Sequence, residues 1–160
     1  MILFKKIRTF FGLGSQMQVM LLEAYCYLAW GRYLKTLNFS RVAPTLGKSM
    51  SETSCSTKTS DKQTLQNVSA AIHLMSRYTF WESECLVKAI AGMKMLEKRR
   101  IESTLYLGTA KEKTGNLVAH AWLRSGPYYI SGSETMNKFT VVASFAKENR
   151  NKKAEGEKNE

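Results

Sequence analysis

The hydrophobic spacing of the chain changes once, near residue 100, and this change constrains the fold more than any other feature. Before it, apolar residues recur every three or four positions, which predicts helices over 16–37, 63–79 and 84–100. After it, short β-prone runs between turns predict strands over 101–109, 117–124, 128–131 and 139–145. Helices followed by a small antiparallel sheet indicate an α+β fold, with the third helix packed on the sheet.

A length of 160 residues predicts one domain with room for a modest core. Composition divides the chain further into four regions. We expect an N-terminal helical region (1–46), a polar linker (47–62), the core (63–146) and a charged, disordered tail (147–160). Residues 16–37 are apolar around most of the predicted helix, so we expect that helix to be largely buried.

The chain is strongly basic, with a net charge of +11. A solvated basic surface explains such a charge, and so does contact with nucleic acid, an anionic membrane surface or an acidic peptide. Residues 2–11 fit either a packed helix with a basic outer face or a helix at a membrane surface. The basic residues are spread through the chain and no nucleic-acid recognition motif is present, so we expect no nucleic-acid partner.

The three cysteines are too few and too widely spaced for a zinc ribbon or a disulfide framework. We therefore expect the thiols to be reduced and the protein to be cytoplasmic. We also expect no bound metal. The N-terminus lacks a signal-peptide cleavage site, and no apolar run reaches the roughly 20 residues of a membrane-spanning helix.

Cys85 lies where the third predicted helix begins. A cysteine in a helix is more often a small buried apolar residue than a nucleophile. The first turn, however, presents unpaired N–H groups and a partial positive charge, which stabilise a thiolate and can bind an oxyanion. Glu82 and Glu84 oppose this effect, so we expect the thiol to depend on an imidazole partner.

His120 lies on the second predicted strand and is the candidate for that partner. Alternation along the strand places His120, Trp122 and Arg124 on one face. The small residues Ala119 and Ala121 leave room for a helix end to approach. The other histidine, His73, lies in a helical pattern with no matching partner, and we assign it a structural role.

A third group usually orients the imidazole of such a pair, and no aspartate follows Asp61. A hairpin centred near Gly126 places His120 opposite residues 131–133. If Gly132 is the partner, Glu134 lies diagonally within reach, so Glu134 is the predicted third catalytic residue. The alternatives, from a register one residue away or from the following turn, are Ser131, Ser133 and Asn137.

Four blocks of the chain resemble the transglutaminase-like leader peptidases of lasso-peptide biosynthesis. The resemblance covers residues 78–145, and its blocks begin at Trp81 (WxxxCLxxA), Lys98 (KRRI), Thr104 (TLYLG) and Ala119 (AHAWL). It implies a papain/transglutaminase-like cysteine protease of bacterial origin. Cys85 is then the nucleophile and His120 the base. Where the family often has an aspartate on the strand after the histidine, this chain has Ser131 to Glu134.

The same resemblance implies the reaction and the partners. The substrate is a ribosomally made precursor peptide, cut at the junction between leader and core. A separate small protein recognises the leader, and a separate ATP-dependent cyclase closes the ring, in agreement with the absence of a GxxxxGKS phosphate loop. No cofactor is expected. We expect Trp81 and Trp122, close to the cysteine and the histidine, to contact the substrate.

Three other functions fit the same residues. A basic nucleic-acid-binding protein would bind DNA in a salt-dependent manner. A transglutaminase-like protein that only binds would keep every activity without Cys85. An enzyme that transfers the acyl group to an amine instead of water would use the same thioester, so the Cys–His pair alone cannot separate it from a peptidase.

Overall fold

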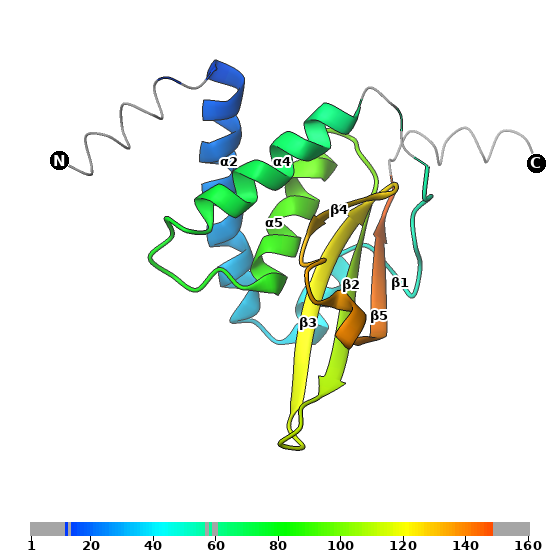
Figure 1. Cartoon of the computed structure of the whole chain (residues 1–160). Coiled ribbons are helices and arrows are strands. Elements are labelled where there is room, and N and C mark those ends of the chain that lie inside the picture. The colour runs from blue at the N-terminus through cyan, green and yellow to red at the C-terminus, as the bar shows by residue number, and fades with distance from the viewer. Residues whose placement is uncertain (1–11, 13, 57, 59–60, 149–160) are drawn as a thin grey trace, which may run out of the picture.

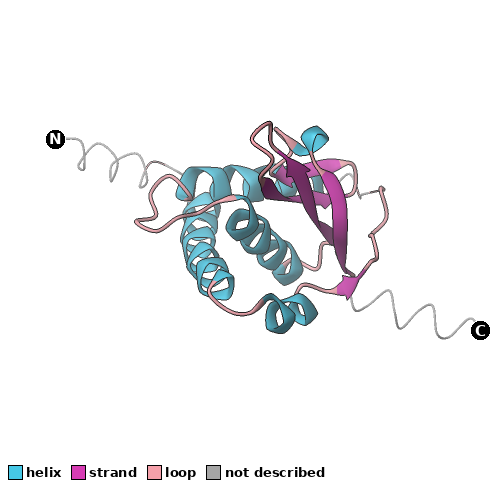
Figure 2. Cartoon of the chain, turned by 90° about the horizontal axis from the view of Figure 1, so that it is seen from below, coloured by secondary structure: helices cyan, strands magenta, loops and turns pink. Residues whose placement is uncertain are grey.

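The computed structural model describes residues 12, 14–56, 58 and 61–148, which form two layers. Helices cover one face of an antiparallel sheet, as the views in Figures 1 and 2 show together. The α+β fold predicted from the change in hydrophobic spacing is confirmed.

The three long helices occur where the apolar spacing predicts them. They are α2 (Ser15–Lys35), α4 (Lys62–Met75) and α5 (Cys85–Lys98). Two short helical segments, α3 (Phe39–Val42) and the 3-10 helix η1 (Ala43–Thr45), follow α2 and were not predicted. Helix α5 lies at the centre, because it packs against α2, α4 and three strands of the sheet.

Two glycines allow α5 to lie close to its neighbours. A Cβ atom on Gly92 of α5 would lie 2.7 Å from the Leu123 side chain of the sheet. A Cβ atom on Gly31 of α2 would lie 2.9 Å from the carbonyl oxygen of Val87 in α5. A side chain at either glycine would therefore push α5 away from α2 or from the sheet, and Cys85 is the first residue of this closely packed helix.

The sheet has the strand order β1-β5-β2-β3-β4. Its strands are β1 (Lys48–Ser49), β2 (Ser103–Lys111), β3 (Leu117–Ser125), β4 (Tyr128–Ser131) and β5 (Thr140–Lys147). The four strands predicted from the sequence are β2 to β5. Every neighbouring pair is antiparallel, and a short 3-10 helix, η3 (Met136–Lys138), lies between β4 and β5.

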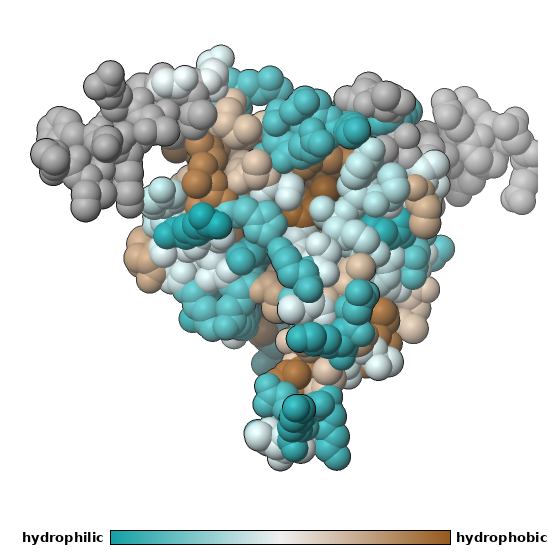
Figure 3. All heavy atoms as spheres, in the orientation of Figure 1, coloured by the Kyte–Doolittle hydropathy of each residue, from teal (hydrophilic) through white to brown (hydrophobic). Residues whose placement is uncertain are grey.

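Helix α2 is buried on one side only, which corrects the prediction that it is largely buried. Met20, Ala24 and Leu28 are in the core. The opposite side exposes large apolar residues, with Val19 and Leu22 each 59% exposed. Figure 3 shows apolar atoms at the surface on the α2 side. An apolar circumference predicted burial on all sides, but α5 and α4 cover only one of them.

The polar segment 47–62 was predicted to be a solvated linker, yet part of it packs on the sheet. Thr53 is buried and its N–H donates to Thr104 Oγ1 over 2.9 Å. Glu52 accepts a hydrogen bond of 2.7 Å from the Tyr106 hydroxyl. Burial, reinforced by this bond, raises the pKa of Tyr106 to about 12, so the phenol keeps its proton and remains a donor.

The same segment also receives a buried guanidinium from β3. Arg124 donates to the Thr53 carbonyl over 3.1 Å and pairs with Glu52 at 3.3 Å. Composition alone missed this packing because the partners lie far along the chain on the sheet. The division of the chain into four regions remains a prediction.

Two further predictions concern the ends of the chain. The basic helix over 2–11 and most of the charged tail lie outside the described residues. Among the residues that are described, no helix combines the length and the apolar character needed to cross a membrane.

Candidate active site

Cys85 is the first residue of α5, one residue after the helix start predicted from the apolar spacing of residues 84–100. Glu84 occupies the N-cap with an extended backbone, but no side chain caps the helix. The N–H groups of the first turn therefore receive no acceptor from the Glu84 side chain, and the half-buried Cys85 is the first residue of that turn. Such groups can stabilise a thiolate and donate to an oxyanion that forms beside it.

The acids beside Cys85 are neutralised by the last turn of α2. Lys35 Nζ lies 3.1 Å from a carboxylate oxygen of Glu84 and 3.4 Å from one of Glu82. Arg32 also pairs with Glu82, at 3.3 Å. The hydrogen bond to Glu84 raises the pKa of Lys35. The two glutamates expected to oppose a thiolate thus have cationic partners from a helix fifty residues earlier in the chain.

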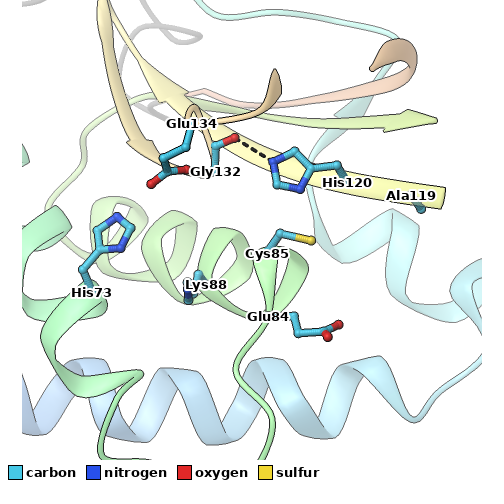
Figure 4. Close-up of a pocket in the computed structure, with 8 residues that line it drawn as sticks. All are labelled: His73, Glu84, Cys85, Lys88, Ala119, His120, Gly132 and Glu134. Atoms are coloured by element: carbon cyan, nitrogen blue, oxygen red, sulfur yellow. Dashed lines mark hydrogen bonds between the residues drawn. The ribbon is translucent and has the colours of Figure 1, made fainter. Parts of the chain in front are cut away.

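The imidazole of His120 is oriented by a backbone carbonyl. Its Nε2 lies 2.7 Å from the carbonyl oxygen of Gly132. Because a carbonyl only accepts, Nε2 carries the proton and Nδ1 is the unprotonated nitrogen of the neutral ring. Figure 4 shows this other nitrogen on the side of the ring that faces Cys85. His120 is therefore in the tautomer that can take a proton from the thiol.

Two aromatic rings hold the faces of the imidazole. Phe139 stacks on His120 with ring centroids 4.9 Å apart, and Trp122 stacks at 5.9 Å. The Trp122 ring and the Cβ of Phe139 both lie against Gly108 of β2. A Cβ atom there would lie 2.8 Å from the Trp122 ring and 2.9 Å from Phe139 Cβ. The absence of a side chain at position 108 is what lets the two aromatic residues close around His120.

The helix start and the strand together form a cleft of about 440 Å³. Figure 4 shows the residues that line it: His73, Glu84, Cys85, Lys88, Ala119, His120, Gly132 and Glu134. Cys85 and His120, the two residues singled out from the sequence, are both in this cleft, on walls that come from different layers of the fold. A thiol, an imidazole and free helix N–H groups around one cavity can support nucleophilic acyl chemistry.

The partner of His120 differs from the predicted one. Glu134 lines the cleft, but in Figure 4 its carboxylate points towards His73. Within the described part of the chain, no hydrogen bond joins Glu134 to the imidazole. The hydroxyl of Thr135, one residue further, lies 3.4 Å from His120 Nε2.

The other predicted candidates for the third group do not contact His120 either. Ser131 is buried, and its hydroxyl has no hydrogen-bond partner among the described residues. Ser133 and Asn137 flank the turn that carries Glu134, and neither forms a side-chain hydrogen bond with the imidazole in the described structure.

The two tryptophans predicted to contact substrate pack against other aromatic rings. Trp81 lies beside Tyr25 of α2, with ring centroids 5.1 Å apart, and beside Phe80 at 4.6 Å. Trp122 is only 5% exposed and stacks between His120 and Tyr106. In this structure Trp122 supports the imidazole; contact of either tryptophan with substrate remains a prediction.

Sequence reasoning missed several residues of the site. Lys88 lines the cleft, and its place three residues after Cys85, on the same helix face, is the sequence signal for it. His73 was assigned a structural role, yet it lines the cleft from α4. No local pattern places it there, because the packing of α4 on α5 decides its position. The Gly132 carbonyl, as a backbone group, has no side-chain signature either.

Metal binding is not indicated for the part of the chain that the structure describes. There, no three His, Cys, Asp or Glu side chains lie close enough to hold an ion together.

Comparison with known families gives one result. The sequence model described as the transglutaminase-like superfamily matches residues 33–144, which run from the last turn of α2 into β5 and include both Cys85 and His120. No curated protein and no solved structure matches the chain.

Proposed function

The chain belongs to the transglutaminase-like superfamily, and from that premise we propose that it is a cysteine peptidase that removes the leader from a lasso-peptide precursor. The observation that carries the proposal is the cleft in which Cys85, at a helix start, faces the unprotonated nitrogen of His120. The resemblance of residues 78–145 to leader peptidases narrows the substrate to a ribosomally made precursor peptide.

In the proposed first step, His120 Nδ1 takes the proton of the Cys85 thiol. The thiolate sulfur then forms a bond to the carbonyl carbon at the leader–core junction, and the carbonyl oxygen becomes an oxyanion. The N–H groups of the first turn of α5 donate to that oxyanion. The C–N bond breaks as His120 returns its proton to the departing amine of the core, which leaves the leader as a thioester on Cys85.

The second step is hydrolysis of this thioester. His120 takes a proton from water while the water oxygen forms a bond to the thioester carbon. The C–S bond breaks, the leader leaves as a carboxylic acid, and Cys85 regains its proton. Through both steps the Gly132 carbonyl keeps Nε2 protonated, so that Nδ1 alone exchanges the proton. Glu134 and Lys88 remain available to contact the bound peptide.

We propose the same partners that the resemblance implies. A small leader-recognition protein delivers the precursor, and an ATP-dependent cyclase receives the released core amine. The reaction would take place in the cytoplasm of a bacterium, where the precursor is made and where thiols stay reduced.

The proposal is tested by incubating the protein with a candidate precursor and its recognition partner, followed by mass spectrometry. We expect wild type to release free leader, and Cys85→Ala to release none. Cys26→Ala is the matched control, because Cys26 is exposed on α2 and should not affect cleavage. An intact precursor with wild type would refute the peptidase, and so would cleavage that survives Cys85→Ala. A leader joined to an added amine would indicate acyl transfer instead of hydrolysis.

A further inference from the structure

One edge of β3 is unpaired beside the cleft. Strand β3 pairs with β2 from Leu117 to Arg124, but β4 pairs only with Leu123, Arg124 and Ser125. Among the strands that the structure describes, none therefore pairs with the opposite side of residues 117–121. Within the described residues, no other backbone hydrogen bond reaches positions 117–119. An unpaired strand edge presents N–H and C=O groups that can pair with another extended chain.

The hairpin register shows which backbone groups point to this edge. Ser125 and Tyr128 flank the two-residue turn Gly126–Pro127, and such flanking residues exchange hydrogen bonds with each other. Every second residue of β3 therefore points its N–H and C=O towards the β4 side. Ala121 follows this rule, because a Cβ on Gly132 would collide with its carbonyl oxygen. By the same alternation, Ala119 and Leu117 point their backbone groups to the free edge.

This edge leads directly into the catalytic cleft. Ala119 is exposed and lines the cleft together with Cys85 and His120. Leu117, two residues further from the cleft, is 77% exposed. Both side chains lie on the same face of the strand, next to backbone groups that have no partner. A peptide paired with this edge would run along the wall of the cleft that Ala119 lines, and the same cleft contains Cys85.

We propose that the substrate binds as an added β-strand along Leu117–Ala119 of β3, with its backbone paired to the free edge. This inference rests on the proposed function and adds the substrate's conformation to it. The occupant is an extended peptide, because the free groups are backbone donors and acceptors in strand geometry. Specificity then comes from alternate side chains of the peptide, one of which would lie towards Lys88 and Glu134 in the cleft.

Ala119→Pro tests the edge, because proline removes its N–H while Val118 and His120 keep their bonds to β2. We expect kcat/KM for the precursor to fall about ten-fold, mainly through KM, as for the loss of one substrate hydrogen bond. Tyr129→Pro is the matched control. Its pairing with Arg124 directs the Tyr129 N–H away from β3, on an edge that does not line the cleft. That variant should stay within about two-fold of wild type.

A scan of precursor peptides that carry one N-methyl group each tests the same pairing from the substrate side. We expect kcat/KM to fall at every second position next to the cleavage site, since only alternate N–H groups of a strand face its neighbour. Full cleavage by Ala119→Pro, equal losses in both proline variants, or a scan without alternation would overturn the inference while leaving the peptidase intact. A dimer that Ala119→Pro dissociates would assign the edge to a second copy. No cleavage by wild type would remove the proposed function and this inference with it.

Discussion

On the helical wall of the cleft, Cys85 is positioned by the backbone. It is the first residue of α5, and Gly31 and Gly92 let this helix pack closely against α2 and the sheet. On the strand wall, His120 is held through its side chain, by the Gly132 carbonyl on one nitrogen and by aromatic rings on its faces. The difference indicates where the site is most sensitive. Small changes beside His120 should affect activity strongly, whereas changes beside Cys85 should affect mainly stability or rate by modest factors.

The largest effect is expected for Gly132→Ala. Gly132 has φ +76, and a Cβ there would collide with the Ala121 carbonyl. Backbone strain and overpacking should lower the free energy of unfolding by about 3 kcal/mol and Tm by about 8 °C. Displacement of the carbonyl from His120 should lower kcat at least about 100-fold. Calorimetry and single-turnover cleavage measure the two effects.

Gly115→Ala is the matched control for that variant. Gly115 also has a positive φ, of +89, but a Cβ there meets open space in the turn between β2 and β3. Gly115→Ala should lower the free energy of unfolding by only about 1 kcal/mol and leave kcat unchanged. If Gly132→Ala retains wild-type kcat, orientation by the carbonyl is not needed, and the contrast between the two walls fails.

Gly108→Ala should have the next largest effect. Its Cβ would displace Trp122 and Phe139 from the faces of His120. We expect a loss of about 2 kcal/mol in the free energy of unfolding and about a ten-fold lower kcat/KM. Urea unfolding and cleavage kinetics check both values. Gly14→Ala, where a Cβ meets nothing, is the control. Normal kinetics in a destabilised Gly108→Ala would show that the stacking supports only the fold.

Glu23→Gln examines the helical wall away from the thiol. The Glu23 side chain is 7% exposed and accepts hydrogen bonds of 2.6 and 3.0 Å from Arg99, which joins α2 to the end of α5. We expect the substitution to lower the free energy of unfolding by about 2 kcal/mol at pH 7 and to leave kcat of the folded protein unchanged. A lower kcat would mean that the α2–α5 contact also positions Cys85.

The same pair predicts a pH dependence. Burial alone would raise the pKa of Glu23, but the bonds and charges of Arg99 and Lys98 outweigh it and lower the pKa below 4.5. The carboxylate therefore stabilises the fold above pH 4.5, and this contribution is lost as the pH falls through the lowered pKa. The free energies of unfolding of wild type and Glu23→Gln, measured with urea, should differ at pH 7 and converge as the pH falls through the lowered pKa. A difference in the free energy of unfolding that does not change with pH would contradict a stabilising ion pair between Glu23 and Arg99.

The smallest effect is expected for Lys35→Met, which removes the cation from Glu82 and Glu84. These ion pairs are largely exposed, so alkylation of Cys85 by iodoacetamide at pH 7 should slow by no more than about three-fold. The assay needs Cys26 and Cys55 replaced by serine, since both are exposed. Lys62→Met at the start of α4 is the control. A ten-fold slower alkylation would show that Glu82 and Glu84 influence the thiol more than these exposed ion pairs indicate. An unchanged rate in low salt would show that they do not influence it.

The main elements of the fold could be predicted because each is encoded locally. The apolar repeat of residues 84–100 and the β-prone run of 139–145 are complete within their own segments, and both elements formed within about two residues of the predicted bounds. Cys85 could be placed at a helix start for the same reason. The packing of part of segment 47–62 could not be predicted in this way, since its partners Thr104 and Arg124 lie some fifty to seventy residues away along the chain.

The sequence by itself determined the order of helices and strands, the start of α5 to within one residue of Cys85 and the face of β3 that carries His120, because apolar spacing and strand alternation act over a few residues. Only the tertiary structure decided what holds the imidazole. The register shift between β3 and β4 at Leu123 brings the Gly132 carbonyl to Nε2 and leaves Glu134 directed elsewhere. A backbone carbonyl is the same in every residue, so its role depends on where the chain places it and on no side chain that a sequence can show.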